Sequence, residues 1–149
     1  MKLNSLLVTL ALFTAALGFT ATAPAADLKF EAQLIWGTSE GMPADSKLKP
    51  ADAEVRKKLA SLPLKWTHYY EVNRQSLAVA ANQTKKSVLS DRCTVEVKRL
   101  GGDKIEVLLL GQGKEVGKVT QQLPRGEILV LAGNAPAENA WLVTLKRIQ

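Results

Sequence analysis

The feature that most limits the fold is an alternation of apolar and polar side chains, repeated in short segments that turn residues separate. In segment 28–36 every second side chain is apolar, as in a half-buried strand. The later segments are 64–73, 92–100, 104–110, 115–123, 127–131 and 141–148, with weaker ones at 77–81 and 87–89. Closely spaced strands with turns between them predict a mainly β fold. We expect a single antiparallel, immunoglobulin-like β-sandwich, with a small β-barrel as the alternative.

One interruption of the β pattern predicts a short helix over 50–62. Val55, Leu59 and Leu62 recur at helical spacing, and Pro50 suits a first helical turn. Acidic residues come early in this segment and basic residues later, as the helix dipole favours. We expect Pro63 to end the helix.

The clearest turn signal is Gly101-Gly102-Asp103, which predicts a hairpin between 92–100 and 104–110. A three-residue loop pairs Val97 with Val107, and it also pairs Lys98 with Glu106. A two-residue loop would instead place Val97 against Glu106. Apolar pairs and opposite charges therefore favour the three-residue register.

The N-terminal segment, 1–25, has the layout of a secretory signal peptide. Lys2 precedes an apolar run over 6–19, and Ala23-Pro24-Ala25 forms a small-residue cleavage site. The run is about 14 residues, shorter than the roughly 20 that span a bilayer, so no stable membrane span is expected after cleavage. We expect cleavage after Ala25, a secreted or periplasmic product, and one β-rich domain over 26–149.

Composition excludes several kinds of chemistry. The chain has one His and one Cys, which excludes zinc fingers, His-rich metal sites and disulfide scaffolds, and no cofactor is expected. The formal net charge is +6, spread along the chain in short basic runs without stacking aromatics between them. This charge pattern argues against a nucleic-acid partner. A weak attraction of the protein to an anionic envelope polymer is physically allowed.

Four possible sites of chemistry have simpler interpretations. Segment 37–41 matches G-x-S-x-G, but a nucleophile elbow needs a helix behind the serine and a downstream histidine, so a loop is favoured. His68 is interpreted as a hydrogen-bonded histidine near the edge of the core. Cys93 is in phase with Val95 and Val97, which indicates a small buried hydrophobic residue with no partner for a disulfide within the chain. Segment 111–114 resembles a phosphate loop but lacks its other residues, and we expect a hairpin turn.

The candidate binding residues are aromatic. Alternation places Phe30, Trp66 and Tyr70 inward, whereas Tyr69 falls on the polar face and Trp36 ends its strand beside a loop. Exposed aromatic side chains on a rigid sheet can anchor a partner with little loss of conformational entropy. We therefore expect a contact surface formed by Trp36, Tyr69 and the loop 37–43.

The chain also resembles a family of small secreted bacterial β-rich proteins of unknown function, of the planctomycete and verrucomicrobial type. The resemblance rests on segments 30–38, 64–66, 71–74 and 125–127, with Tyr69, Ser90, Cys93 and Trp141. It implies export and a β-rich domain, and it carries over no catalytic residue. From the residues we expect a non-enzymatic binding or structural module of the cell envelope, with an unknown protein or polymer partner. A small secreted hydrolase acting on an envelope polymer is the alternative.

Overall fold

The fold is known from a computed structural model that describes residues 23, 25–42, 44, 46–132 and 139–149. Of the predicted signal peptide only Ala23 and Ala25 belong to the described residues, so that prediction lies almost wholly outside them. Pro43, in the predicted contact loop, also lies outside.

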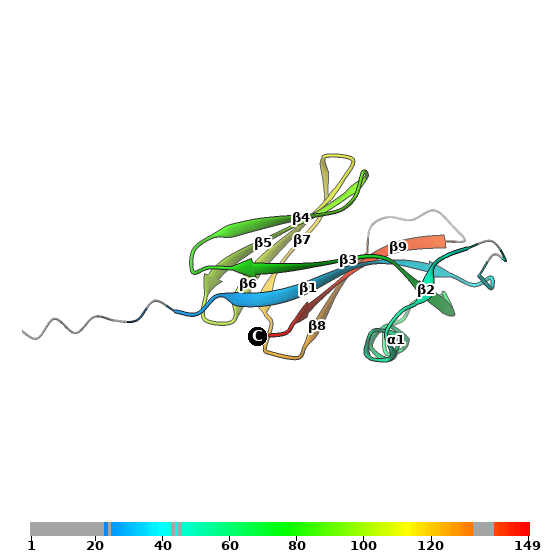
Figure 1. The fold of residues 1–149 in the computed structure, drawn as a ribbon, viewed down its shortest axis with the longest axis horizontal. Helices are drawn as coiled ribbons and strands as arrows, with labels where there is room; N and C mark the ends of the chain where they lie inside the picture. Colours follow the sequence, from blue (N-terminus) through cyan, green and yellow to red (C-terminus); the bar gives the residue numbers. More distant parts are fainter. Residues whose placement is uncertain (1–22, 24, 43, 45, 133–138) are drawn as a thin grey trace, which may run out of the picture.

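Within the described residues nine strands form two antiparallel sheets, and one helix accompanies them (Figure 1). The first sheet has the order β2-β3-β1-β9-β8, and the second has the order β4-β5-β6-β7. The elements of the first sheet are β1 (Leu28–Thr38), β2 (Lys49–Pro50), β3 (His68–Val79), β8 (Ile128–Ala132) and β9 (Asn139–Arg147). Those of the second are β4 (Thr84–Ser90), β5 (Cys93–Gly101), β6 (Lys104–Gly111) and β7 (Lys114–Gln122), and the helix is α1 (Ala53–Ala60).

The prediction of a mainly β antiparallel sandwich with one short helix is confirmed. The described strands form two separate sheets and not a closed barrel, so the alternative is not adopted. The second sheet is a simple meander, and the chain crosses between sheets after β3 and again after β7. Immunoglobulin domains share the two-sheet architecture but exchange strands between their sheets more often.

The main core lies between the two sheets. Its central side chains on β1 are Phe30 and Ala32, both fully buried, and they face Val95, Val97 and other residues of the second sheet. The predicted hairpin register is confirmed, because Val97 pairs with Val107 and Lys98 pairs with Glu106. Apolar residues on the inner faces of both sheets thus supply the burial that stabilises the sandwich.

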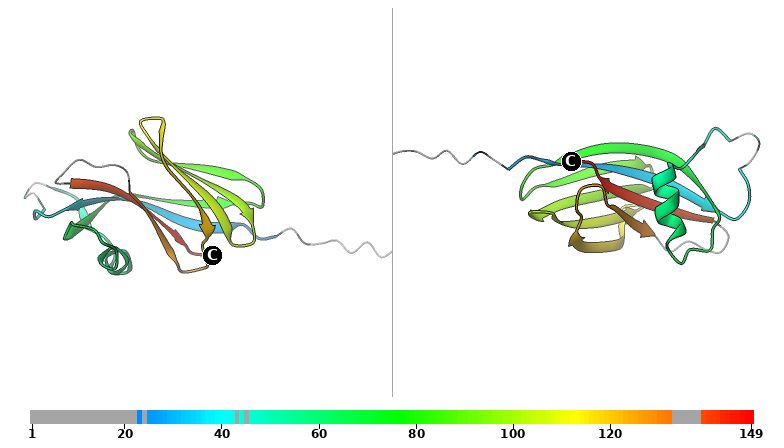
Figure 2. Two further views of the ribbon diagram at one scale, coloured as in Figure 1. Left: turned by 180° about the vertical axis from the view of Figure 1, so that it is seen from behind. Right: turned by 90° about the horizontal axis from the view of Figure 1, so that it is seen from below.

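Figure 2 shows α1 lying across the other face of the first sheet. A second apolar cluster lies under this helix. Val55 and Leu59 of the helix are buried there against Ile35 and Leu142. The helix is shorter than predicted, because Pro50 belongs to β2 and the helix ends at Ala60, before Pro63. With this helix in place the first sheet is covered on both faces, so a simple inward–outward alternation does not describe it.

The predicted strand 64–73 and the weak strand 77–81 are one strand, β3, which starts at His68. In its pairing with β1, Leu34 lies opposite Asn73 and Ile35 opposite Glu71, so Val72 is the extra residue of a β-bulge in β3. Val72 packs against the main core, and Asn73 donates from Nδ2 to the Leu89 carbonyl of β4 at 2.8 Å. Strict alternation from Tyr69 would place Asn73 on the same face as Tyr69, but the bulge turns it toward the second sheet.

Candidate functional site

A cleft of about 730 Å³ lies between the two sheets at one end of the sandwich. Figure 1 shows the sheets diverging toward the β4–β5 and β6–β7 turns. Ligand sites for small molecules usually enclose roughly 300–1,000 Å³, so this cleft has a suitable size. Its lining residues are Leu34, Val72, Ser90, Asp91, Arg92, Cys93, Leu109, Leu110, Gly111, Gln112, Val116, Trp141 and Val143.

The rim of the cleft on the second sheet is built from two turns that are joined to each other. The backbone N–H of Gln112 donates to the Arg92 carbonyl at 2.9 Å, which links the β6–β7 turn to the β4–β5 turn. Within the β4–β5 turn the Arg92 N–H donates to Ser90 Oγ at 3.2 Å. The β6–β7 turn needs positive φ at Gln112 (52°) and Gly113 (77°), as a two-residue hairpin turn does. The prediction of a hairpin turn at 111–114 is confirmed.

An aromatic row borders the cleft on the first sheet. Trp36 of β1 is paired with Tyr70 of β3 on one side and with Trp141 of β9 on the other, so the three side chains share one face. The Trp36 and Tyr70 rings have centroids 5.8 Å apart. Trp141 is 55% exposed, Trp36 is half-buried, and Tyr70 is buried. Trp141 is thus the aromatic side chain of this row that is most available to a ligand.

The two residues predicted as contact anchors lie on opposite faces of the first sheet. Trp36 belongs to the row beside the cleft. Tyr69 was predicted to be exposed on the polar face, and this is wrong, because only 7% of it is exposed. Its ring packs over Gly37, where an added Cβ would come within 3.1 Å of it, and its hydroxyl donates to the Trp66 carbonyl at 3.1 Å. The cluster under α1 covers this face, which the alternation alone did not reveal.

Two other predicted orientations also change. Trp66 was expected to face the core, but it is half-buried and packs on the cluster under α1. His68 was expected near the core edge; it is exposed at the start of β3, with Nδ1 3.0 Å from Thr67 Oγ1. Ser39 of the G-x-S-x-G segment donates from its hydroxyl to the Lys65 carbonyl at 3.4 Å.

Cys93 lies in the wall of the cleft and is half-buried. It packs against the main core, in phase with Val95 and Val97 as predicted. Burial raises the pKa of its thiol above the ordinary value of 9.0, so the thiolate fraction at neutral pH is small.

The sequence alone does not reveal the cleft or its principal aromatic side chain. It predicts Trp141 only as the start of a strand, and it gives no sign that the two rim turns lie together. The pairing of Trp141 with Trp36 brings together residues far apart in the chain, and nothing in the local sequence around either residue specifies it.

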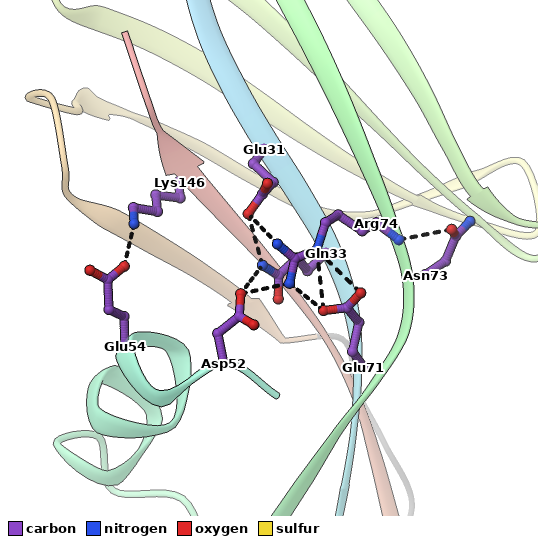
Figure 3. Close-up of polar contacts among 8 residues, drawn as sticks. All are labelled: Glu31, Gln33, Asp52, Glu54, Glu71, Asn73, Arg74 and Lys146. Carbon is purple, nitrogen blue, oxygen red and sulfur yellow. Dashed lines mark hydrogen bonds and ion pairs between the residues drawn. The ribbon is translucent and has the colours of Figure 1, made fainter. Parts of the chain in front are cut away.

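A separate polar cluster occupies the face of the first sheet beside α1 (Figure 3). The Arg74 guanidinium contacts Glu31 at 3.1 Å, Asp52 at 2.6 Å and Glu71 at 2.5 Å. Hydrogen bonding to Glu71, although opposed by burial, raises the pKa of Arg74 with help from Asp52 and Glu31. The side chain of Gln33, only 1% exposed, donates from Nε2 to Glu31 and Asp52. Three carboxylates are thus neutralised in part by one arginine that joins β3, β1 and the start of α1.

This polar cluster has a structural role. It fixes Asp52, the residue before α1, to the first sheet, and the Lys146–Glu54 ion pair adds a second tie between β9 and the helix. Among the described residues no group of three or more His, Cys, Asp or Glu side chains is arranged to hold a metal ion. No helix in the described ranges is long and apolar enough to cross a membrane.

Comparison with family models, with curated proteins and with solved structures gives no match.

Proposed function

We propose that the protein is an exported, non-enzymatic binding module of the cell envelope and that its ligand occupies the cleft between the sheets. The observation that carries the proposal is the cleft itself, which combines a buried apolar floor with the exposed ring of Trp141 at its mouth. Large apolar side chains left exposed beside a concave site are typical of binding surfaces.

The side chains around the cleft favour binding over hydrolysis. Asp91 is the one carboxylate among the described lining residues, and His68 is not one of them. A glycoside hydrolase would use a pair of carboxylates, and most other hydrolases use a base beside a nucleophile. The lone Cys93 is half-buried, and its raised pKa makes it a weak nucleophile.

Export is part of the proposal, and one contact near the expected cleavage site supports it. Arg99 is only 8% exposed, and its Nη1 donates to the Ala26 carbonyl at 2.8 Å. The residue directly after the proposed cleavage position is therefore already attached to the sandwich. A mature chain that starts at Ala26 keeps every contact of the two cores.

The test uses mature protein purified under native conditions from the envelope fraction of its host. The intact mass reports whether the chain starts at Ala26, and native mass spectrometry reports any retained envelope component.

Three proteins are compared: wild type, Trp141→Ala, and Val88→Ala as a control, because Val88 is 63% exposed and does not line the cleft. We expect wild type and Val88→Ala to retain the same component. Loss of an anchor worth roughly 2 kcal/mol should weaken retention by Trp141→Ala about thirtyfold.

Equal thermal unfolding temperatures for the three proteins would show that the loss is one of binding and not of folding. Retention that is unchanged in Trp141→Ala, or a wild-type protein that binds nothing from the envelope, would contradict the proposal.

A further inference from the structure

The floor of the cleft offers a ligand mainly apolar side chains. Leu34 and Val143 come from the first sheet, and Leu109 and Cys93 come from the second. Polar side chains belong to the rim, where Ser90, Asp91, Arg92 and Gln112 lie in the two turns. A sugar normally requires polar side chains beside its hydroxyl groups, so this floor does not suit one.

The strands that form the floor also disfavour an extended peptide. β1, β9, β5 and β6 are inner strands of their sheets, with neighbours on both sides. A peptide that adds a strand to a sheet needs a free strand edge with unpaired backbone groups. The floor of the cleft presents side chains and not such an edge, so an apolar ligand fits it better than an extended peptide does.

The charges at the rim indicate which polar group the ligand carries. Arg92 is exposed, and no ion pair within the described part of the chain involves it, whereas Arg74 and Arg147 are both paired with carboxylates. Asp91 is adjacent to Arg92 on the same rim. Arg92 therefore offers one unpaired positive charge at the rim, with a carboxylate next to it, which suits a headgroup with one negative charge better than a polyanion.

The mouth of the cleft is suited to the entry of an apolar chain. Trp141 is 55% exposed and Val116 is 49% exposed, and both line the cleft. An amphipathic aromatic such as Trp is favourable where an apolar region meets water. The cleft thus has apolar side chains at its mouth as well as on its floor.

We infer that the cleft binds the acyl chain of a fatty acid, with the carboxylate at Arg92 and the chain between the sheets. This inference rests on the proposed function and names the ligand class of the same site. Binding is noncovalent, and no reacting group is required.

Cys93 provides a direct measurement, because it is the one cysteine of the chain and lies in the wall of the cleft. The rate of its alkylation by N-ethylmaleimide is followed by intact mass at mildly alkaline pH, with octanoate, decanoate or dodecanoate below micelle-forming concentrations. We expect all three to slow alkylation. The concentration for half protection should fall about fourfold for each added methylene, as burial of that group predicts.

Variants at the rim test whether the carboxylate of the fatty acid lies at Arg92. Arg92→Gln should weaken protection by dodecanoate about tenfold and leave protection by dodecanol unchanged, because the alcohol carries no charge. Arg125→Gln is the matched control, since Arg125 is exposed outside the cleft and should behave as wild type. Circular dichroism shows whether the ligands leave the fold intact.

Absence of protection by any chain length would overturn the inference, as would protection that does not grow with chain length. Equal effects of Arg92→Gln on the acid and the alcohol would overturn the placement of the carboxylate. If an envelope component is retained through Trp141 while fatty acids give no protection, the ligand class is wrong and the proposed function stands. If neither binds, both proposals fail.

Discussion

Arg74 is the residue on which the largest polar cluster of the described structure depends. It contacts carboxylates from β1, from its own strand and from the residue before α1. Removal of the guanidinium leaves Glu31, Glu71 and Asp52 without their shared cation, and two of them are only 21% exposed. An interaction of this kind stabilises more than an isolated surface ion pair.

The first residue-scale prediction is that Arg74→Met lowers the free energy of unfolding by about 1 to 2 kcal/mol, a value that allows for screening because Arg74 is 35% exposed. Lys86→Met is the control, since it removes an ion pair with Glu96 in which Lys86 is 68% exposed. The control should change stability by less than about 0.5 kcal/mol. Urea unfolding measures both, and equal losses would contradict the structural role given to Arg74.

The effect of Arg74→Met should also depend on pH in a defined direction. Burial acts to raise the pKa of Asp52, but the hydrogen bond and charge of Arg74 outweigh it, so the pKa lies below the ordinary 3.8. A carboxyl with a lowered folded-state pKa contributes stability above its unfolded-state pKa and loses it as the pH falls through the folded-state value. The difference between wild type and Arg74→Met should therefore be largest near neutral pH and narrow below pH 3.8. A constant difference would show that Asp52 contributes nothing.

At the scale of elements, α1 covers the face of the first sheet that points away from the second sheet. Leu59 is 1% exposed and packs in the cluster that includes Ile35 and Tyr69. Leu59→Ala should lower the free energy of unfolding by about 2 to 4 kcal/mol, the usual range for a buried leucine. Lys58→Ala, an exposed change on the same helix, should cost less than about 0.5 kcal/mol. A small effect of Leu59→Ala in thermal and urea unfolding would mean that α1 is not part of the stable core.

The elements differ in how far the sequence predicts them. The β5–β6 hairpin was predicted with its register, because two alternating segments and a Gly-Gly-Asp turn agree with each other. In β3 the alternation was misleading, because a bulge opposite Leu34 reverses its phase. The helix over Tyr69 then buries a side chain that alternation places outward. Bulges and long-range coverage depend on tertiary contacts, which a local pattern does not encode.

On the scale of the whole molecule, the sandwich is closed by its core over most of its length and diverges at the end bordered by the β4–β5 and β6–β7 turns. The sandwich architecture was predictable because the strand segments and turns are local signals. The cleft was not, because Trp36, Trp141 and the two turns meet only through the pairing of distant strands. Trp36 was identified as a candidate by its place at a strand end, although its partner Trp141 is the more exposed side chain.

The most direct test of the cleft as the binding site is an amide NMR titration of the isotope-labelled mature protein with dodecanoate. If the ligand lies in the cleft, the largest shifts should fall on the rim turns, at Ser90 to Cys93 and at Gly111 and Gln112, together with the Trp141 indole. Amides of α1, on the other face of the first sheet, should stay unchanged. Shifts that are largest on α1, or no shifts in the rim turns at saturating ligand, would contradict it.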